Sequence, residues 1–581
     1  MQSYNYKTYT QLYRHITQTY NNPTFLNYIE NNIYKNISVQ EFKDKVRFLA
    51  FALKDLGIKK NDSVAIFTES SPFWLIFDFA LHIIGAISVP IFANISSKNL
   101  NYEIDDSNIN YIFVGSKERL SEITSKINII TLNKNDDLEN NIYLDSLFNK
   151  GEQLDKEKVY DIDALIDESE EDEVFSCIYT SGNTGIPKGV QLTHQNMLTQ
   201  LHDISEWFDI NQSDRALSLL PLAHIFERTV MSFYLSRGIS VYFVDDLVNV
   251  GALMKEVKPT IMTVVPRLLE KIISKMRIKI DEKSGLGFLI ANAAFNRAIE
   301  KTSTEDSIFD KLYKKVVYPK LTESFGGELN ILVSGGSSLS KDIHNFFVNI
   351  GINLYQGYGL TEFSPVISTN YPNHNKVGTC GLPLKSVEIK LSHDNELLAR
   401  GNSVMLGYRN KSKLTHETVD ADGWLHTGDL ASIDNEGYVT IYSRKKELFK
   451  TSNGEYVSVI PIEQKISKSP YIDFATVIAN DRKYATALIF VDEQMYEQYK
   501  MRNNLDSSFT IEDYYSSKRV QQKIQKHINK VNKQFNNWEK IVKYEIITTP
   551  ISIETGELTP SMKICRAVID IKYKEIINNM Y

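Results

Sequence analysis

The chain has only three cysteines among its 581 residues, and they lie far apart at Cys177, Cys380 and Cys565. Disulfide-stabilised secreted domains and zinc sites need cysteines at short, paired spacings, so the sequence predicts neither. Unpaired thiols suit a reducing compartment, and we therefore expect a cytoplasmic protein.

The sequence also shows no excess of basic residues, no leader-like start and no long uninterrupted apolar run. The net charge of −7 gives no electrostatic reason to expect nucleic-acid binding. The start MQSYNYKTYTQLY has no basic-then-apolar signal pattern. One apolar stretch, Ser71–Phe92, is interrupted by Asp78, His82, Gly85 and Pro90. It predicts a buried helix over 73–84 and a buried strand over 86–92, so any membrane contact should be peripheral, on the inner face.

Up to about residue 440, short β-branched runs alternate with amphipathic stretches. A turn or helix signal follows each run, which is typical of largely parallel strands buried on both faces. The strands that we expect are DSVAIFT, NYIFVG, VFSCIYT, ISVYFV, TIMTVV and NILVSG. This large region is therefore predicted to be α/β, with mostly parallel sheets flanked by helices.

Residues 266 to about 325 follow a helical pattern instead. RLLEKIISKMRIKI carries apolar residues on one helical face, and SIFDKLYKKVV does the same with Ile308, Leu312 and Val316. Such helices could surround an apolar tunnel or simply pack together, and the periodicity does not decide between the two. After SRKKELFK the pattern changes again, and the last ~135 residues are long enough for a small α+β domain.

The stretch YTSGNTGIPKGV, Tyr179–Val190, has the composition of an anion-binding loop. Glycines let the backbone approach a ligand closely, and successive free N–H groups form a concavity for anions. The stretch does not match the phosphate loop G-x-x-x-x-G-K-[ST], because Lys188 lies between Pro187 and Gly189 and a strand follows it. By composition alone, an anion cradle and a plain surface turn are equally good interpretations.

The same stretch resembles the signature Y-T-S-G-T-T-G-x-P-K-G-V of the adenylate-forming superfamily, which includes acyl-CoA synthetases, luciferases and nonribosomal adenylation domains. It departs from the usual form at Asn183, whose side chain still donates hydrogen bonds. The resemblance implies that the loop binds the phosphates of ATP through Thr180, Ser181, Gly182, Asn183, Thr184, Gly185 and Lys188. Further motifs follow in the family's order along nearly the whole chain.

PLAHIFER, Pro221–Arg228, resembles the next motif of the family, and its HIFER form is similar to that of long-chain fatty acyl-CoA synthetases. The resemblance implies that His224 lies at the wall between the acyl and nucleotide pockets. VPRLLEK and the long helical stretch before LVSGGSSL also resemble this class. In LVSGGSSL, the resemblance implies that Gly335 and Gly336 lie against the adenine, where a side chain would keep the base away from the backbone.

YQGYGLTE, Tyr355–Glu362, is the second specific motif. The resemblance implies that Tyr358 and Gly359 lie at the adenine, with the tyrosine ring stacked on the base. It places Thr361 at the α-phosphate and assigns Mg²⁺ to Glu362 and Ser181. A carboxylate together with phosphate oxygens is a usual set of ligands for this ion.

Three later motifs complete the set. GWLHTGDL supplies Asp429, expected to accept hydrogen bonds from the ribose hydroxyls, and SRKKEL supplies Arg444, expected at ribose and phosphate. Lys446 matches the family's hinge, so we expect a large domain over 1–444, a hinge over 445–447 and a small lid domain over 448–581. LTPSMK supplies Lys563, the expected lysine of the adenylation step.

The resemblance implies an enzyme that uses ATP and Mg²⁺ to convert a long-chain fatty acid to acyl-AMP and then transfers the acyl group to coenzyme A. Its expected catalytic residues are Lys563, Thr361, Glu362 and His224. Two alternatives stay open: a fatty acyl-AMP ligase that passes the acyl group to a carrier protein, and a non-catalytic fatty-acid-binding relative. The complete set of motifs argues against the second alternative.

Overall fold

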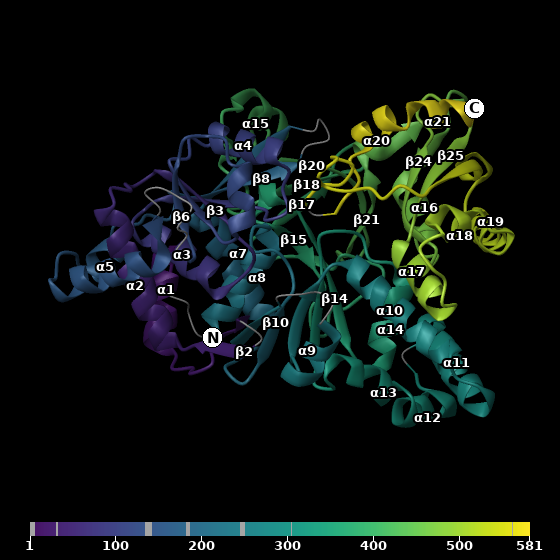
Figure 1. Cartoon of the computed structure of the whole chain (residues 1–581), viewed down its shortest axis with the longest axis horizontal. Helices are drawn as coiled ribbons and strands as arrows, with labels where there is room; N and C mark the ends of the chain where they lie inside the picture. The colour runs from purple at the N-terminus through teal and green to yellow at the C-terminus, as the bar shows by residue number, and fades with distance from the viewer. Residues whose placement is uncertain are drawn as a thin grey trace.

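The structure is a computed structural model that describes residues 6–30, 33–133, 142–181, 186–244, 250–303, 305–560 and 562–581, with only the backbone described for Ser181. Figure 1 shows two large sheets with their helices and, at the upper right, the carboxy-terminal part of the chain. Elements from all three parts converge near the middle of the molecule.

The first large sheet is mostly parallel. Within the described ranges it has nine strands in the order β16 (Leu382–Pro383), β15 (Val366–Thr369), β14 (Asn353–Gly359), β13 (Ile331–Ser334), β12 (Ile261–Val264), β10 (Arg215–Ser218), β11 (Ser240–Phe243), β1 (Leu26–Glu30) and β2 (Ile33–Ile37). Every pairing from β14 to β1 is parallel, and the outer pairings are antiparallel.

The second large sheet repeats this arrangement. Its eight strands in the described part of the chain are β19 (Gly407–Tyr408), β9 (Pro187–Thr193), β8 (Val174–Ser181), β4 (Ile87–Ile91), β3 (Ser63–Phe67), β5 (Tyr111–Val114), β6 (Asn128–Thr131) and β7 (Ile142–Tyr143). Only the pairings of β9 with β8 and with β19 are antiparallel. The glycine-rich stretch therefore joins the two strands of a hairpin.

Smaller sheets follow along the chain. Strands β17 (Glu388–Leu391), β18 (Glu396–Arg400), β20 (Leu425–Ile433) and β21 (Val439–Arg444) form an antiparallel sheet. After it come the hairpin of β22 (Leu448–Lys450) and β23 (Tyr456–Ser458) and the mixed sheet of β24 (Ile472–Ile478), β25 (Ala485–Val491) and β26 (Ile541–Ile547).

Helices cover the sheets and fill the space between them. Those of the large region are α1 (Tyr9–Thr19), α2 (Val39–Asp55), α3 (Pro72–Ile83), α4 (Ser97–Asp106), α5 (Leu144–Lys156), α6 (Ile162–Asp167), α7 (His194–Trp207), α8 (Ile225–Ser236), α9 (Val250–Val257), α10 (Pro266–Asp281), α11 (Gly285–Glu300), α12 (Ile308–Val316), α13 (Tyr318–Thr322), α14 (Lys341–Ile350) and α15 (Ser412–Thr418). The largest buried cluster includes Leu12, Phe42, Trp74, Met197 and Met231, from α1, α2, α3, α7 and α8.

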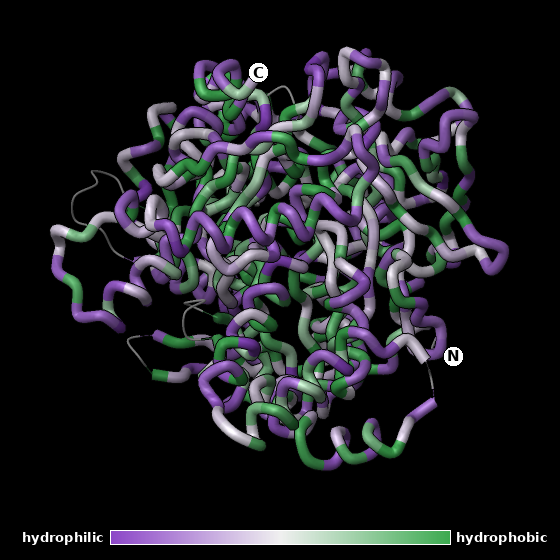
Figure 2. The backbone as a smooth tube through the Cα atoms, turned by 90° about the vertical axis from the view of Figure 1, so that its right-hand side faces the viewer, coloured by the Kyte–Doolittle hydropathy of each residue, from purple (hydrophilic) through white to green (hydrophobic). Residues whose placement is uncertain are grey.

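The carboxy-terminal part has a hydrophobic core of its own. Val459, Ile489 and Ile524 belong to one buried cluster that contains no residue before 457. Its helices are α16 (Val459–Ile466), α17 (Glu493–Arg502), α18 (Ile511–Ser516), α19 (Lys518–Asn532), α20 (Arg566–Lys572) and α21 (Lys574–Asn579). Figure 2 shows hydrophobic residues along the interior segments.

The predicted fold class is confirmed. The apolar stretch near residue 80 forms the buried helix α3 and the buried strand β4, and all six expected strands form. The strand after the glycine-rich loop begins earlier than the sequence indicated, at Pro187, because residues 187–189 pair with β8. On α12, Ile308, Leu312 and Val316 share a face as expected, but that face is exposed rather than packed.

Candidate active site

The glycine-rich stretch lies between β8 and β9, where Thr180 pairs with Lys188 across the hairpin. Gly182, Asn183, Thr184, Gly185 and the side chain of Ser181 lie outside the described residues. The Lys188 ammonium lies 5.2 Å from the centroid of the Tyr408 ring. Burial lowers the pKa of Lys188, Glu362 opposes this effect, and Lys446 reinforces it. Lys188 therefore lies within electrostatic range of two other predicted site residues.

Glu362 follows β14 in a single 3₁₀ turn, Thr361–Phe363. A side chain at Gly359 would place its Cβ 1.7 Å from the carbonyl oxygen of Pro365, so only glycine fits where the strand enters this turn. The Tyr408 hydroxyl donates to Oε1 of Glu362 at 2.7 Å. Among the described residues, Oε2 of Glu362 has no hydrogen-bond or ion-pair partner. One carboxylate oxygen is thus available to a ligand.

Asp429 and Arg444 lie directly opposite each other on the antiparallel strands β20 and β21. The Arg444 Nε is 3.2 Å from Oδ1 of Asp429, and the Tyr358 hydroxyl donates to Oδ2 at 2.7 Å. Burial is the main cause that raises the pKa of Tyr358, and Asp429 raises it further. The hydroxyl therefore stays protonated and the carboxylate keeps a donor.

His224 precedes α8 as its amino-terminal cap. Its Nδ1 accepts a hydrogen bond from the Phe226 N–H at 3.2 Å, so any ring proton of the neutral form lies on Nε2. Burial, with a further contribution from Lys563, lowers the pKa of His224 to about 4. The imidazole is thus neutral near pH 7.

The Gly335–Gly336 turn packs against this helix start. A Cβ at Gly335 would lie 2.9 Å from the Phe226 ring, so a side chain there would displace the aromatic ring next to His224. Gly336 has φ +79°, a conformation that side chains disfavour. The two glycines therefore fix the spacing between β13 and the start of α8.

Lys563 comes from the far end of the chain. It lies in a turn closed by the bridge between Leu558 and Ile564, and its N–H donates to the Thr559 hydroxyl at 3.0 Å. In the described part of the chain its ammonium has no hydrogen-bond or ion-pair partner. Lys563 is an exposed residue, yet its ammonium lies close to protein atoms that displace water. This desolvation is the main cause that lowers the pKa of Lys563, and the charge of Arg444 lowers it further.

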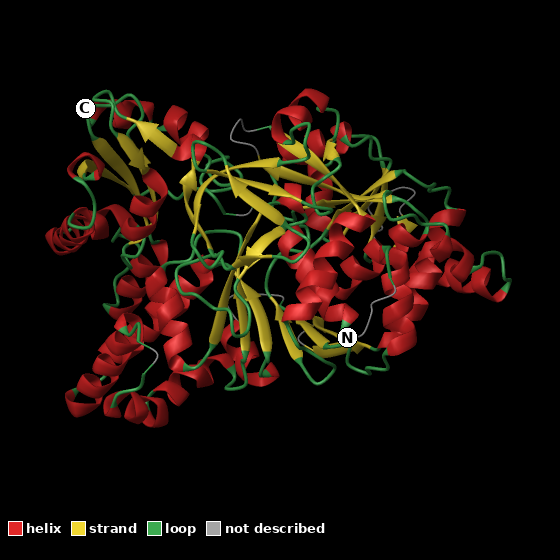
Figure 3. Ribbon diagram, turned by 180° about the vertical axis from the view of Figure 1, so that it is seen from behind, coloured by secondary structure: helices red, strands yellow, loops and turns green. Residues whose placement is uncertain are grey.

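The carboxy-terminal part, marked by C in Figure 3, contacts the large region through several polar side chains. Arg267 Nη2 on α10 donates to the carbonyl of Asp473 on β24 at 2.7 Å and also pairs with its carboxylate. Lys468 pairs with Asp342 at 3.0 Å. At the turn itself, the Asn94 amide donates to the carbonyl of Pro560 at 3.1 Å.

The expected hinge residue lies between these parts. Lys446 is in a short 3₁₀ helix, Lys445–Glu447, directly after β21. On one side, Lys445 is 3.3 Å from Glu396 of β18. On the other, Leu448 begins the β22–β23 hairpin. The backbone at Lys446 thus connects the sheet that carries Arg444 to the part that carries Lys563.

Sequence reasoning missed Tyr408, which holds Glu362, and Asn94, which contacts the lysine turn. Neither belongs to a motif quoted above, and each meets its partner only through the fold, across 46 residues in the case of Tyr408. The one signal available for Tyr408 was its place at the end of the apolar run VMLGY, Val404–Tyr408, which indicates a buried segment but no partner.

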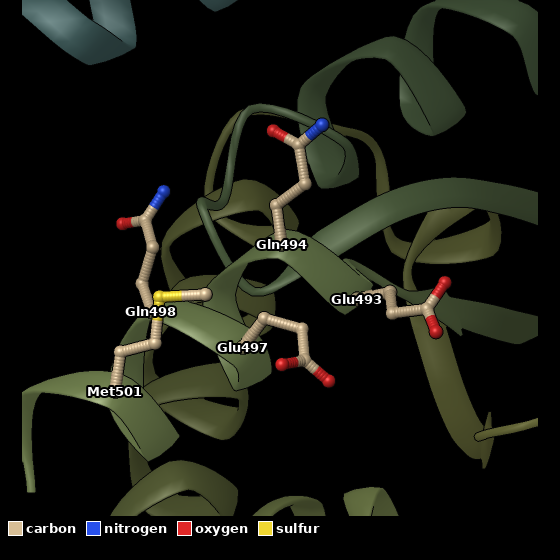
Figure 4. A pocket seen from close by; sticks show the side chains of 5 residues that line it. All are labelled: Glu493, Gln494, Glu497, Gln498 and Met501. Atoms are coloured by element: carbon tan, nitrogen blue, oxygen red, sulfur yellow. The ribbon is translucent and has the colours of Figure 1, made fainter. Parts of the chain in front are cut away.

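Three further observations concern a surface hollow, metal-binding clusters and membrane-spanning helices in the described part of the chain. Figure 4 shows a hollow on α17 lined by Glu493, Gln494, Glu497, Gln498 and Met501, none of which is a predicted site residue. No group of three or more His, Cys, Asp or Glu residues suited to a metal ion occurs in the described chain. No helix of the described chain has the length and hydrophobicity needed to span a membrane.

Comparison with known proteins agrees with the motifs. Long-chain-fatty-acid–CoA ligase FadD15 of Mycobacterium bovis is 29% identical over 95% of this chain and 93% of its own length. Long-chain-fatty-acid–CoA ligase 5 of Rattus norvegicus is 27% identical over 95% of this chain and 85% of its own length. The adenylation domain of a Mycobacterium chelonae carboxylate reductase shares the fold, with a TM-score of 0.76 at 19% identity over 100% of this chain and 92% of that one.

The family assignment rests on matches at both ends of the chain. Residues 12–409 match the AMP-binding enzyme family, and residues 447–581 match the AMP-binding enzyme C-terminal domain. The first match alone covers more than half of the 581 residues. The chain therefore belongs to the family of AMP-binding enzymes, as its motifs predicted.

Proposed function

We propose that the chain is an ATP-dependent long-chain fatty acid–CoA ligase. The observation that carries this proposal is the meeting of Lys563, His224 and the Asp429–Arg444 pair, which come from three distant parts of the sequence. The naming of the relatives as long-chain-fatty-acid–CoA ligases, over nearly the whole of this chain, supports the choice of substrate and acceptor.

In the first half-reaction, the fatty carboxylate attacks the α-phosphate of ATP and pyrophosphate leaves. The Lys563 ammonium and the Thr361 hydroxyl would stabilise the charge that builds on the phosphoryl oxygens. Lys188 and the glycine-rich loop would hold the outer phosphates. Tyr358, Gly335 and Gly336 would bound the adenine, while Asp429 and Arg444 would bind the ribose.

Glu362 is the residue that would hold Mg²⁺. Its Oε2 lacks a partner among the described residues, and one carboxylate with phosphate oxygens and water suits this ion. The ion would neutralise phosphate charge when bound. The hydroxyl of Ser181, which the sequence also assigns to this ion, lies outside the described side chains.

In the second half-reaction, the thiol sulfur of coenzyme A attacks the acyl-adenylate carbonyl and AMP leaves. We propose that the part over 448–581 rotates about residues 445–447, withdrawing Lys563 from the large domain over 1–444. A few residues that change φ and ψ suffice for such a rotation. His224 would stay neutral at the boundary between the acyl and nucleotide pockets, because its pKa is about 4.

A long-chain substrate requires an apolar passage. Helix α10 supplies inward apolar residues, with Leu269, Met276 and Ile280 buried. Helix α12 does not contribute to such a passage, because its apolar face is exposed. We further propose that the enzyme works at the inner surface of a membrane as a peripheral protein, where its apolar substrates concentrate.

The test is a series of fatty acids from octanoate to oleate, with ATP and coenzyme A, in which pyrophosphate and acyl-CoA are measured together. The proposal predicts equal yields of both products and a higher kcat/KM for palmitate than for octanoate. Pyrophosphate release with accumulation of acyl-AMP and no acyl-CoA would contradict it and indicate transfer to a carrier protein. Absence of both products would indicate a non-catalytic binder.

A further inference from the structure

Helix α12 carries its apolar side outward, the reverse of an ordinary surface helix. Asp310 and Tyr313 face inward, and Asp310 accepts hydrogen bonds from Arg297 of α11 at 2.9 and 3.0 Å. The outward apolar residues and their exposed fractions are Ile308 at 85%, Phe309 at 66%, Leu312 at 51% and Val316 at 47%. We call these four residues the α12 face.

The α12 face lies on an outlying arm of the molecule. Helices α11, α12 and α13 form the lower right end of the molecule in Figure 1. The start of α11 is also apolar and exposed, through Leu286, Leu289 and Ile290. Exposed apolar side chains gathered on one arm, rather than scattered singly, indicate a surface that another body covers.

The arm is basic in a chain that is acidic overall. Residues 285–322, which contain α11, α12 and α13, have six lysines and arginines against four aspartates and glutamates, whereas the whole chain has a net charge of −7. On and beside α12, Lys311, Lys315 and Lys320 are exposed, and their ammonium groups have no partner among the described residues. By helical spacing, Lys311 and Lys315 flank the apolar stripe of Ile308 and Leu312.

We propose that the α12 face and its flanking lysines dock onto the surface of an anionic lipid bilayer. A helix that combines large apolar residues with lysines can lie in the interface with its apolar side among the acyl chains, while the ammonium groups contact anionic headgroups. Unpaired lysines along one side of an apolar stripe complement a surface of negative charge. The net acidic remainder of the chain would orient away from such a surface.

The inference is independent of the reaction that the chain catalyses, since it rests only on the exposure and charge of α12. The surface lies outside the residues that bind nucleotide in the proposed function. Docking can therefore fail while the ligase activity stands, and the activity can differ while the docking stands.

The test uses the full chain in flotation with two kinds of vesicle: phosphatidylcholine alone, and phosphatidylcholine mixed with phosphatidylglycerol. We expect binding to the mixed vesicles that weakens with salt, and little binding to the neutral ones. In Lys311→Glu/Lys315→Glu, binding should weaken by at least about tenfold, since each lysine near such a surface contributes about fivefold. In Phe309→Ser/Leu312→Ser, binding should also weaken by at least about tenfold, because the apolar side chains no longer enter the acyl region.

The matched control is Met501→Ser. Met501 is 73% exposed on α17, and Figure 4 shows it beside two glutamates and two glutamines of the same helix. This control should bind the vesicles like the parent chain. Adenylation of octanoate, a soluble substrate, should be the same in all variants and shows that they fold.

Two outcomes would overturn the proposal. One is binding of the parent chain that is equal for neutral and anionic vesicles or absent from both. The other is loss of self-association, measured by light scattering in the Phe309→Ser/Leu312→Ser variant without vesicles, which would show that a second copy of the chain covers the α12 face.

Discussion

The two sides of the proposed nucleotide site are held in different ways. On one side, Asp429 and Arg444 face each other on paired strands, and Tyr358 adds a hydrogen bond to the same carboxylate. On the other side, Lys563 lies in a turn, and its ammonium has no bonding partner among the described residues. The difference teaches that the proposed ribose-binding pair of Asp429 and Arg444 is fixed within one sheet, whereas the proposed lysine of the adenylation step lies in a separate part of the chain.

The largest effect should come from the delivered side. Lys563→Ala removes a positive charge that no described neighbour can replace at the same point. We expect the rate of adenylation, measured as pyrophosphate release, to fall by about 100-fold or more. Lys574→Ala, an exposed lysine on the nearby α21, is the control and should keep the parent rate. A similar loss in both variants would contradict a specific role for Lys563.

The fixed side should respond through binding. Asp429→Asn keeps the shape of the side chain but removes the charge that pairs with Arg444. A hydrogen bond to a charged group contributes about 1.5–3 kcal/mol, so we expect the KM for ATP to rise by about 10- to 100-fold. Asp422→Asn, at an exposed position before β20, is the control. An unchanged KM for ATP would remove Asp429 from the nucleotide site.

The connection between the two sides can be stiffened. Proline fixes φ, so Lys446→Pro should hinder a rotation that changes this angle. We expect acyl-CoA formation from a supplied acyl-adenylate to slow by about tenfold, and pyrophosphate release in a single turnover to slow less. Equal slowing of both half-reactions would count against a hinge at Lys446.

The smallest effect should come from the contact that holds the delivered side. Arg267→Glu breaks the pair with Asp473, in which both side chains are about one-third exposed. Because such pairs contribute about 1 kcal/mol or less, we expect adenylation to slow by up to about fivefold. The double variant Arg267→Glu/Asp473→Arg should recover the rate. Arg502→Glu, which breaks the more exposed pair with Glu282, is the control and should change little.

The sequence predicted the fold and the family well, for physical reasons that can be named. Runs such as VFSCIYT and TIMTVV are short, apolar and β-branched, and they form the buried strands β8 and β12. The family follows from motifs whose order is fixed along the chain. The roles of the individual site residues remain predictions, although several of these residues meet in space as the motifs indicated.

Other features could not be predicted because they depend on tertiary contacts. The Tyr408–Glu362 hydrogen bond joins two elements that no pattern pairs. The helical period of α12 identified its apolar face, but period alone cannot tell whether such a face turns inward or outward. In α12 the buried Asp310 pairs with Arg297, whose side chain is 40% exposed, and the apolar residues lie on the outer side of the helix.

The most direct test of a fixed and a delivered side is a comparison of the two half-reactions in Lys563→Ala. Palmitoyl-AMP would be supplied with coenzyme A, and acyl-CoA formation would be followed in a single turnover. The account predicts that this step keeps a rate within about threefold of the parent chain, because Lys563 acts only while the phosphate charge builds. A loss as large as that of pyrophosphate release would contradict the account.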